Sequence, residues 1–248
     1  MPLNSPYTFE ICVETPDALK ACVGVADRIE LCSGLDVGGL TPSFGLMEQA
    51  KASGVETHVL IRPRDGDFAM TFADLAIAVA DIRAACRLGL KGVVIGAERG
   101  GALDQSAIDE MVQAADGMDV TLHRVIDVLD DPIAAMDVAI ECGFVRILTS
   151  GSATSAPTGI AGLTRLHRAS AGRIEIMAGT GVTSKNIADI MDQTNIKAFH
   201  ASCSNMVPFG QRYAALGFGK ATRLFDLKEA IQIAAQLAVG RLDQDPCD

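Results

Sequence analysis

Short apolar segments alternate with longer segments of helical periodicity along the whole chain. Each short segment is rich in Val, Ile or Leu and is bounded by Gly, Pro or charged residues, which is typical of buried strands. Eight such strand–helix units, of about 31 residues each, fit into the 248 residues. The predicted strands are Tyr7–Val13, Arg28–Leu31, Glu56–Ile61, Gly92–Ile95, Asp119–Leu122, Val145–Leu148, Ile174–Met177 and Ala198–Ala201.

Capping residues support the helices between these strands. Residues typical of helix starts are Thr15-Pro16, Asp131-Pro132 and Ser184. Eight β–α alternations without a linker predict a closed (β/α)8 TIM barrel, a single domain over residues 1–248 with the barrel at about 7–240 and short flexible tails. A doubly wound open sheet is the alternative, but such sheets usually have about five to seven strands.

Polar residues gather directly after the predicted strands. Arg62-Pro63-Arg64, His123-Arg124 and Thr149-Ser150-Gly151 each follow an apolar segment. The connections from strand to helix are long and polar, whereas those from helix to strand are short. Because the carboxyl ends of all barrel strands meet at one rim, this pattern predicts a functional site there.

Strand alternation indicates which side chains point into the barrel. In the first strand Glu10 and Cys12 share the inward face, and in the second strand Arg28, Glu30 and Cys32 do. The same rule turns Arg62, His123 and His200 inward near the rim, with Ser202 beyond them. Buried charge requires a partner, so Glu10, Glu30, Arg28 and Arg62 form either a structural network or a catalytic or ligand-binding site.

Composition and charge restrict the class of protein. The chain is 49% hydrophobic and has a formal net charge of −10, which argues against nonspecific binding to nucleic acid or to anionic membranes. No apolar run is long enough to span a bilayer. The first six residues lack the basic and apolar regions of a signal peptide. The seven scattered Cys are therefore expected to be reduced thiols in a cytoplasm.

The rim residues allow more than one chemistry. His123 and His200, converging with Glu10 and Glu30, suit either general acid–base catalysis or a divalent ion. Cys12 and Cys32 suit core packing or a Cu(I) site, although no Cys-x-x-Cys spacing supports a metal. Gly179-Thr180-Gly181 follows the seventh strand and enters a helix, which indicates an anion site or a tight turn.

Several longer motifs resemble the CutC family, named for copper homeostasis, from about Phe9 to Leu237. The matching runs are Glu10-Ile11-Cys12, Ala26-Asp27-Arg28-Ile29-Glu30-Leu31-Cys32-Ser33, Gly38-Gly39-Leu40-Thr41-Pro42-Ser43, Ile61-Arg62-Pro63-Arg64, Gly66-Asp67-Phe68, Asp81-Ile82, Gly92-Val93-Val94-Ile95-Gly96, Thr121-Leu122-His123-Arg124, Arg146-Ile147-Leu148-Thr149-Ser150-Gly151 and Ile176-Met177. The resemblance implies a (β/α)8 barrel, a cytoplasmic location, self-association and a copper link with Cys12 and Cys32 as ligands. Met70 and Val125-Ile126 depart from the family pattern, and we expect both to reshape the pocket.

Two functions are consistent with these residues. In the first, a cytoplasmic protein buffers or traffics Cu(I) bound by Cys12 and Cys32. In the second, an enzyme of the lyase or isomerase type acts on a small anionic or phosphorylated substrate. Its proton-transfer residues would be Glu10, Glu30 and His123, and its anion-binding residues would be Arg62, Arg64, Arg124, Ser150, Gly179, Gly181 and His200.

The long connection after the last strand is unusually apolar. It contains Met206, Val207, Pro208, Phe209, Tyr213, Leu216 and Phe218. Such a segment either covers the barrel mouth as a lid or forms an interface between copies. We expect a homodimer with this loop at or near the contact, since two-fold dimers are the commonest soluble oligomers.

Overall fold

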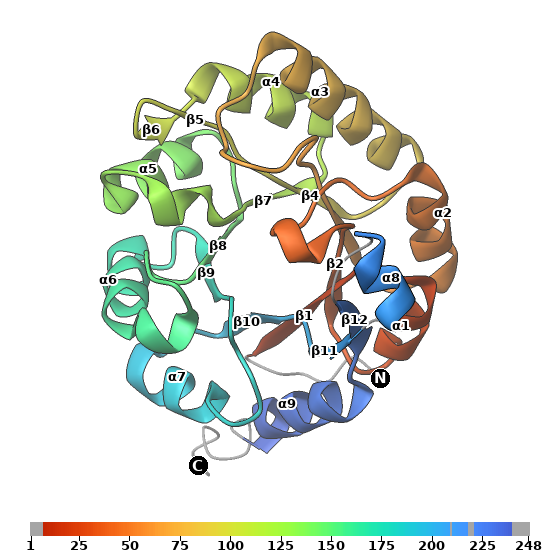
Figure 1. Ribbon diagram of the computed structural model, residues 1–248. Helices are drawn as coiled ribbons and strands as arrows, with labels where there is room; N and C mark the ends of the chain where they lie inside the picture. Colours follow the sequence, from red (N-terminus) through yellow and green to blue (C-terminus); the bar gives the residue numbers. More distant parts are fainter. Residues whose placement is uncertain (1–6, 209, 218–220, 240–248) are drawn as a thin grey trace.

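Eight parallel strands close into a barrel, as the sequence predicts (Figure 1). The computed structural model describes residues 7–208, 210–217 and 221–239. Around the ring the strands follow the order β1, β2, β3, β4, β7, β8, β9, β10 and back to β1. Their bounds are Thr8–Val13 (β1), Arg28–Leu31 (β2), Thr57–Leu60 (β3), Gly92–Ile95 (β4), Asp119–Leu122 (β7), Arg146–Thr149 (β8), Glu175–Ala178 (β9) and Ala198–Ala201 (β10).

Helices surround the barrel on its outer side (Figure 1). They are α1 (Pro16–Cys22), α2 (Phe44–Ser53), α3 (Phe72–Arg87), α4 (Gln105–Ala115), α5 (Pro132–Glu141), α6 (Ile160–Ser170), α7 (Ile187–Thr194) and α9 (Leu227–Val239), with short 3-10 turns η1 (Leu35–Val37), η2 (Arg124–Val128) and η3 (Ala156–Thr158). Thr15 and Asp131 cap α1 and α5 as predicted. The prediction of a helix start at Ser184 was wrong, because α7 begins at Ile187 and Ser184 instead donates to Glu229.

Two antiparallel hairpins lie in connections that the sequence suggested were loops. The first pairs β5 (Glu98–Arg99) with β6 (Ala102–Leu103). The second pairs β11 (Ser204–Pro208) with β12 (Ala221–Phe225), and α8 (Gln211–Ala215) lies between them. The long apolar connection therefore has its own backbone hydrogen bonds, although Phe209 and Phe218 lie outside the described residues.

The barrel strands alternate strictly between the helix layer and the barrel interior. Ile11, Ile29 and Val59 are fully buried against the helices. The inward face instead holds the charged residues and two small apolar clusters. These clusters are Cys12, Cys32, Leu60 and Val94 on one side, and Leu148, Met177 and Ala198 on the other. The inward positions predicted by alternation are confirmed. None of the helices within the described residues is long and apolar enough to cross a membrane.

Candidate functional site

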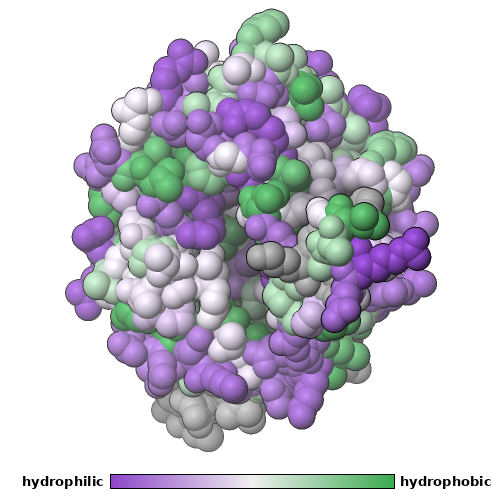
Figure 2. Space-filling model, viewed as in Figure 1, coloured by the Kyte–Doolittle hydropathy of each residue, from purple (hydrophilic) through white to green (hydrophobic). Residues whose placement is uncertain are grey.

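The carboxyl ends of the strands open into a cavity of about 680 Å³. Figure 2 shows the surface hollowed near the centre of this face. This volume is typical of a site for a small molecule. Sequence-predicted residues in its wall are Cys12, Glu30, Arg62, His123, Arg124, Gly181 and His200. Predicted residues outside the wall are Glu10, Cys32, Arg64, Ser150 and Gly179.

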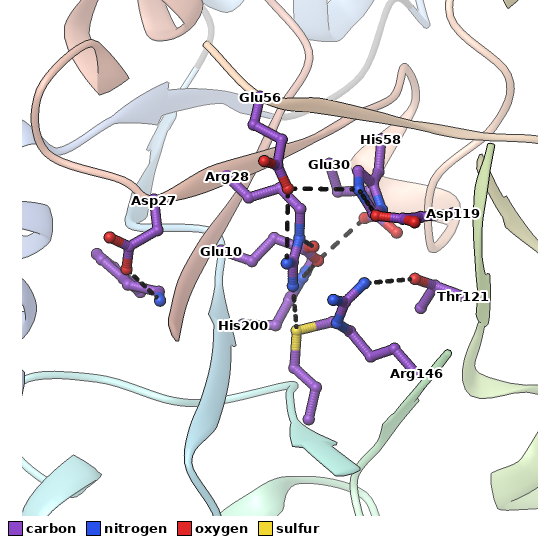
Figure 3. A network of polar contacts seen from close by, with 12 residues as sticks. Glu10, Asp27, Arg28, Glu30, Glu56, His58, Asp119, Thr121, Arg146 and His200 are labelled. Carbon is purple, nitrogen blue, oxygen red and sulfur yellow. Dashed lines mark hydrogen bonds and ion pairs between the residues drawn. The ribbon is translucent and has the colours of Figure 1, made fainter. Parts of the chain in front are cut away.

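Glu10 lies fully buried inside the barrel, beneath the cavity, and holds two neighbours (Figure 3). Its Oε2 accepts a hydrogen bond from Arg28 Nε at 2.5 Å, and its Oε1 lies 2.7 Å from His200 Nδ1. Burial works against ionisation, but Arg28 and then His200 lower the pKa of Glu10 far below its usual value. A carboxylate that stays ionised orients its partners, and this position favours that role over the proton transfer expected from the sequence.

His200 connects Glu10 to the cavity. Because Nδ1 faces Glu10, Nε2 points to the other side, 3.8 Å from Glu30 Oε2. Burial opposes the charged imidazolium, but the Cys12 sulfur, Glu10 and Glu30 together raise the pKa of His200 well above 6.5. The ring therefore carries a proton on each nitrogen at neutral pH in the absence of another ligand.

Glu30 behaves differently from Glu10 although both are inward carboxylates. Its side chain is 7% exposed and lines the cavity. Burial raises its pKa to about 7, an effect that His200 only partly offsets. A carboxyl group that is half ionised near neutral pH is suited to accept and donate protons.

The two cysteines of the sequence analysis occupy different environments. Cys12 lines the cavity, and its Sγ, a Glu30 carboxylate oxygen and a His200 ring nitrogen all lie within 4.8 Å of one another. Cys32 is fully buried outside the cavity wall, and its thiol donates to the Val13 carbonyl at 3.4 Å. Burial, followed by the charge of Cys12, raises the pKa of Cys32 well above 9. Of these two cysteines, only Cys12 lines the cavity.

Arg62 does not join the charged network of Glu10 and Glu30. Its side chain reaches across the rim, where Nη1 donates to the carbonyls of Val37 and Gly39, and Nη2 to that of Gly66. It forms no ion pair with any carboxylate of the described residues. The guanidinium therefore fixes two loops and keeps an uncompensated positive charge at the cavity wall.

Arg64 lies apart from the cavity. Its guanidinium pairs with Asp67 at 2.9 Å and with Asp74 at 3.2 Å, next to the capping box that starts α3. Two carboxylates already offset its charge. This position favours a structural role over the anion binding expected from the sequence.

His123 is a neutral donor. Its Nδ1 accepts the Val125 N–H at 3.1 Å, and its Nε2 is buried without a hydrogen-bond partner. Burial, together with the charge of Arg62, lowers its pKa to about 3. Gly96 makes room for the ring, because a Cβ there would lie 2.6 Å from His123 Cε1. An imidazole that stays neutral can polarise a ligand oxygen through Nε2–H, but it does not titrate near neutrality.

Asp127 was missed by the sequence analysis. Its carboxylate accepts from Arg124 Nε at 2.9 Å, from Thr149 Oγ1 at 2.6 Å and from both the amide and the hydroxyl of Ser150. Asp127 thereby partly offsets the charge of Arg124. The amide and the hydroxyl of Ser150 are both engaged by Asp127. The only sequence signal was the spacing, since Asp127 follows Arg124 by three residues, the distance of a helical ion pair.

The Gly179–Gly181 turn has two roles, one in strand packing and one in the cavity wall. A Cβ at Gly179 would lie 2.4 Å from the Leu148 side chain, so this glycine permits close packing of β9 on β8. Thr180 and Gly181 both have positive φ angles and line the cavity together with Lys185. Because α7 begins only at Ile187, residues 182–186 separate the turn from the helix N-terminus, which removes the helix potential that the sequence analysis expected at Gly181.

The chain is similar to several known proteins. The model of the CutC family matches residues 7–205. A CutC family protein of Agrobacterium fabrum is 46% identical over 222 residues, which cover 88% of both chains. One from Caulobacter vibrioides is 43% identical, over 84% of this chain and 86% of the relative. A crystal structure of a copper homeostasis protein CutC candidate from Streptococcus agalactiae has a TM-score of 0.75 and 32% identity, and the match covers 79% of this chain and 98% of that one.

The chain belongs to the CutC family. The match to the family model includes every barrel strand and ends inside β11, so most of the β11–β12 hairpin and the whole of α9 lie beyond it. Of the two departures from the CutC pattern, Val125 and Ile126 are fully buried, and Met70 lines a small recess beside Arg64. None of the three lines the large cavity, so the expected reshaping of that pocket is not seen in its wall.

Proposed function

We propose that this CutC-family protein binds a metal ion at the mouth of its barrel through Cys12, Glu30 and His200. The observation that carries the proposal is the convergence of three buried donor atoms, all within 4.8 Å of one another, from the adjacent strands β10, β1 and β2. The cavity on their open side gives an ion a route in and out. Copper is the ion suggested by the description of the Streptococcus agalactiae relative.

The donor set suits copper as cargo. A thiolate and an imidazole are ligands that copper ions prefer. The Glu10 carboxylate fixes His200 through Nδ1 at 2.7 Å, which leaves Nε2 as the metal-binding nitrogen. This carboxylate–histidine arrangement is the usual outer-shell support of a metal-binding His. Binding requires His200 to release its Nε2 proton, so affinity should rise with pH.

Cys32 fits this site less well than the sequence analysis expected. Its thiol already donates to a backbone carbonyl, it does not line the cavity, and its raised pKa disfavours the thiolate. We therefore place Glu30 and His200 in the ligand set in place of Cys32. The Cys12–Cys32 pair is the competing set for Cu(I).

Competition against a Cu(I) chelator under anaerobic conditions separates the two sets. We expect Cys12→Ser and His200→Gln each to weaken Cu(I) binding at least about tenfold, while Cys32→Ser binds like the parent. Equal losses in Cys12→Ser and Cys32→Ser, with none in His200→Gln, would restore the two-thiol set. Unchanged affinity in all three variants would remove the mouth as a copper site.

A second candidate is the acid–base enzyme on a small anionic substrate. It is favoured by a specific juxtaposition: Glu30, with a pKa of about 7, shares the cavity wall with Arg62 and Lys185, neither of which forms an ion pair with a described residue. Cations bind the substrate anion, and Glu30 moves a proton in a lyase or isomerase reaction.

The homodimer and the cytoplasmic location expected from the sequence stay predictions.

Saturable stabilisation by inorganic phosphate tests the anion site. In the presence of a metal chelator, phosphate should raise the Tm above that in chloride at equal ionic strength, because a ligand of the native state stabilises by mass action. Lys185→Gln should reduce this increase, whereas Arg64→Gln, outside the cavity, should not. Identical melting curves in phosphate and chloride would argue against the anion site.

A further inference from the structure

At the end of the barrel where the strands begin, opposite the cavity, His58 lies between two carboxylates (Figure 3). It is the second residue of β3, Glu56 directly precedes that strand, and Asp119 begins β7. The His58 side chain is 0% exposed, and neither ring nitrogen has a hydrogen-bond partner. Its Nε2 lies 3.7 Å from Glu56 Oε1 and 3.9 Å from Asp119 Oδ2.

A glycine on the intervening strand sets the direction of the ring. A Cβ at Gly92 of β4 would lie 2.7 Å from His58 Cε1 and 2.8 Å from His58 Nδ1. The missing side chain lets the imidazole cross β4 from β3 toward β7, with its Nδ1 edge against the glycine. Nε2 therefore faces the two carboxylates.

The distances from His58 Nε2 to the two carboxylate oxygens are too long for hydrogen bonds, but they are short enough for the groups to interact electrostatically. A buried imidazole with both nitrogens unpartnered costs free energy, and distances of 3.7–3.9 Å to the carboxylates do not repay it. Burial lowers the pKa of His58 to about 3, so the ring is neutral at physiological pH and has a free lone pair. This protonation state is that of a metal ligand and excludes an ion pair.

The surrounding charges permit a cation. Arg28 and Arg146 also face this end of the barrel, and each is paired at closer range with another carboxylate, Glu10 and Glu175 respectively. Arg28 Nη1 also lies 4.0 Å from Glu56 Oε1 and offsets part of its charge. Lys91 lies 3.6 Å from Asp119 Oδ2 and is itself exposed to solvent. The two carboxylates at His58 are thus only partly neutralised.

We propose that Glu56, His58 and Asp119 bind a borderline divalent ion, with Zn²⁺ as the best match to one imidazole and two carboxylates. Donor atoms that share a tetrahedral Zn²⁺ lie about 3.4 Å apart, so the two separations from His58 Nε2 need to close by only a few tenths of an ångström. All three donor atoms lie within 4.8 Å of one another. Glu56 and Asp119 are 43% and 32% exposed, which leaves water access for the fourth position.

Such an ion ties β3 to β7 across β4 at the end of the barrel that does not hold the cavity. This end of a (β/α)8 barrel is associated with stability rather than catalysis. The inference is independent of the proposed function, because it shares no ligand with the mouth.

Zn²⁺ titration calorimetry with the full chain carrying Cys12→Ser, which removes the thiolate of the mouth, tests the site. In that background Glu56→Gln and Asp119→Asn should each weaken one Zn²⁺ site at least about tenfold. Both positions are partly exposed and the replacements are isosteric, so the fold is retained. Asp116→Asn is the matched control, since it removes an exposed carboxylate three positions away at the same end of the barrel.

NMR of the imidazole nitrogens shows whether Zn²⁺ binds to Nε2 of His58. Zn²⁺ should shift the Nε2 signal of His58 in the Cys12→Ser protein and in Asp116→Asn, and should fail to do so in Asp119→Asn at the same concentration. Zn²⁺ binding that is equal in all four proteins, or a His58 Nε2 signal that Zn²⁺ leaves unmoved, would overturn the proposal.

Discussion

Two inward glutamates on the neighbouring strands β1 and β2 have opposite acid–base behaviour. Glu10 meets Arg28 and His200 directly, so its pKa falls, whereas Glu30 has no hydrogen-bond partner within the described residues and its pKa rises to about 7. The difference lies in the partners rather than in burial, since both are buried. The same residue type on neighbouring strands, with Glu30 opposite Cys12 and Glu10 opposite Arg28, thus yields one fixed anion and one titrating group.

The raised pKa of Glu30 makes stability depend on pH in a defined direction. Between 4.5 and about 7 the folded chain holds a proton that the unfolded chain has lost, so the free energy of unfolding falls as pH rises and levels off above pH 7. Glu30→Gln removes this loss. In the presence of a metal chelator, the free energy of unfolding of the variant, measured in urea, should rise relative to that of the parent by up to about 3 kcal/mol between pH 4.5 and 7.5. A difference that is the same at both pH values would contradict the prediction.

His123 should not titrate in the physiological range. Its pKa of about 3 and the Val125 N–H donated to Nδ1 keep the ring neutral with the proton on Nε2. The Cε1 proton signal of His123 should therefore stay constant from pH 5 to 8, while that of the partly exposed His167 serves as an internal comparison. A midpoint between pH 5 and 8 for His123 would return it to the role of a general acid or base.

At the scale of elements, the rim is held by close backbone approach as much as by side chains. A Cβ at Gly162 of α6 would lie 2.1 Å from the Gly151 carbonyl oxygen, and one at Gly159 would lie 1.8 Å from that of Ser150. The start of α6 therefore packs directly on the loop after β8. That loop is fixed from its other side by Asp127.

Gly162→Ala should be clearly destabilising despite the helical location. The added methyl group must displace backbone, which costs about 1–3 kcal/mol and outweighs the better helix propensity of Ala. Gly45→Ala in α2 is the matched control, since a Cβ there meets nothing within 4 Å and should stabilise by up to about 1 kcal/mol. Chemical denaturation of both variants measures the contrast, and equal effects would contradict the packing argument.

At the scale of the whole molecule, the β11–β12 hairpin lies at the cavity and also carries exposed apolar side chains. Ser204, Asn205 and Arg223 line the cavity, and Arg223 Nη2 lies 2.9 Å from Asp36 Oδ1 in η1. The hairpin also exposes apolar side chains to solvent. These include Met206 (50% exposed) and Leu224 (51% exposed). The hairpin thus combines residues of the cavity wall with exposed apolar side chains, and the lid and interface interpretations of the sequence both stay predictions.

We expect the exposed apolar side chains of this hairpin to form the contact of a homodimer. Leu224→Glu should dissociate the dimer in light scattering, because an unpaired charge in an apolar contact costs several kcal/mol. Ile231→Glu on α9 is the control, with the same 51% exposure away from the hairpin. A monomeric parent at micromolar concentration, or a dimer that Leu224→Glu leaves intact, would contradict this expectation.

The sequence by itself determined the barrel and the side of each strand that faces inward. Strand boundaries differ by at most one residue from those predicted, and Glu10, Cys12, Glu30 and His200 point inward as alternation requires. These properties follow from a local period of two residues and from the repeated β–α order, both of which are readable in short windows.

Only the tertiary structure decided which inward residues meet. His200 and Glu10 are separated by 190 positions and touch because β10 closes the barrel onto β1. Arg62 turns to loop carbonyls and leaves the carboxylates, and Cys32 turns away from the cavity that holds Cys12. His58 has the same inward parity, yet its carboxylate neighbours come from positions that the local pattern does not connect. Barrel closure and the reach of long side chains set these contacts, and neither is encoded in the spacing along a single strand.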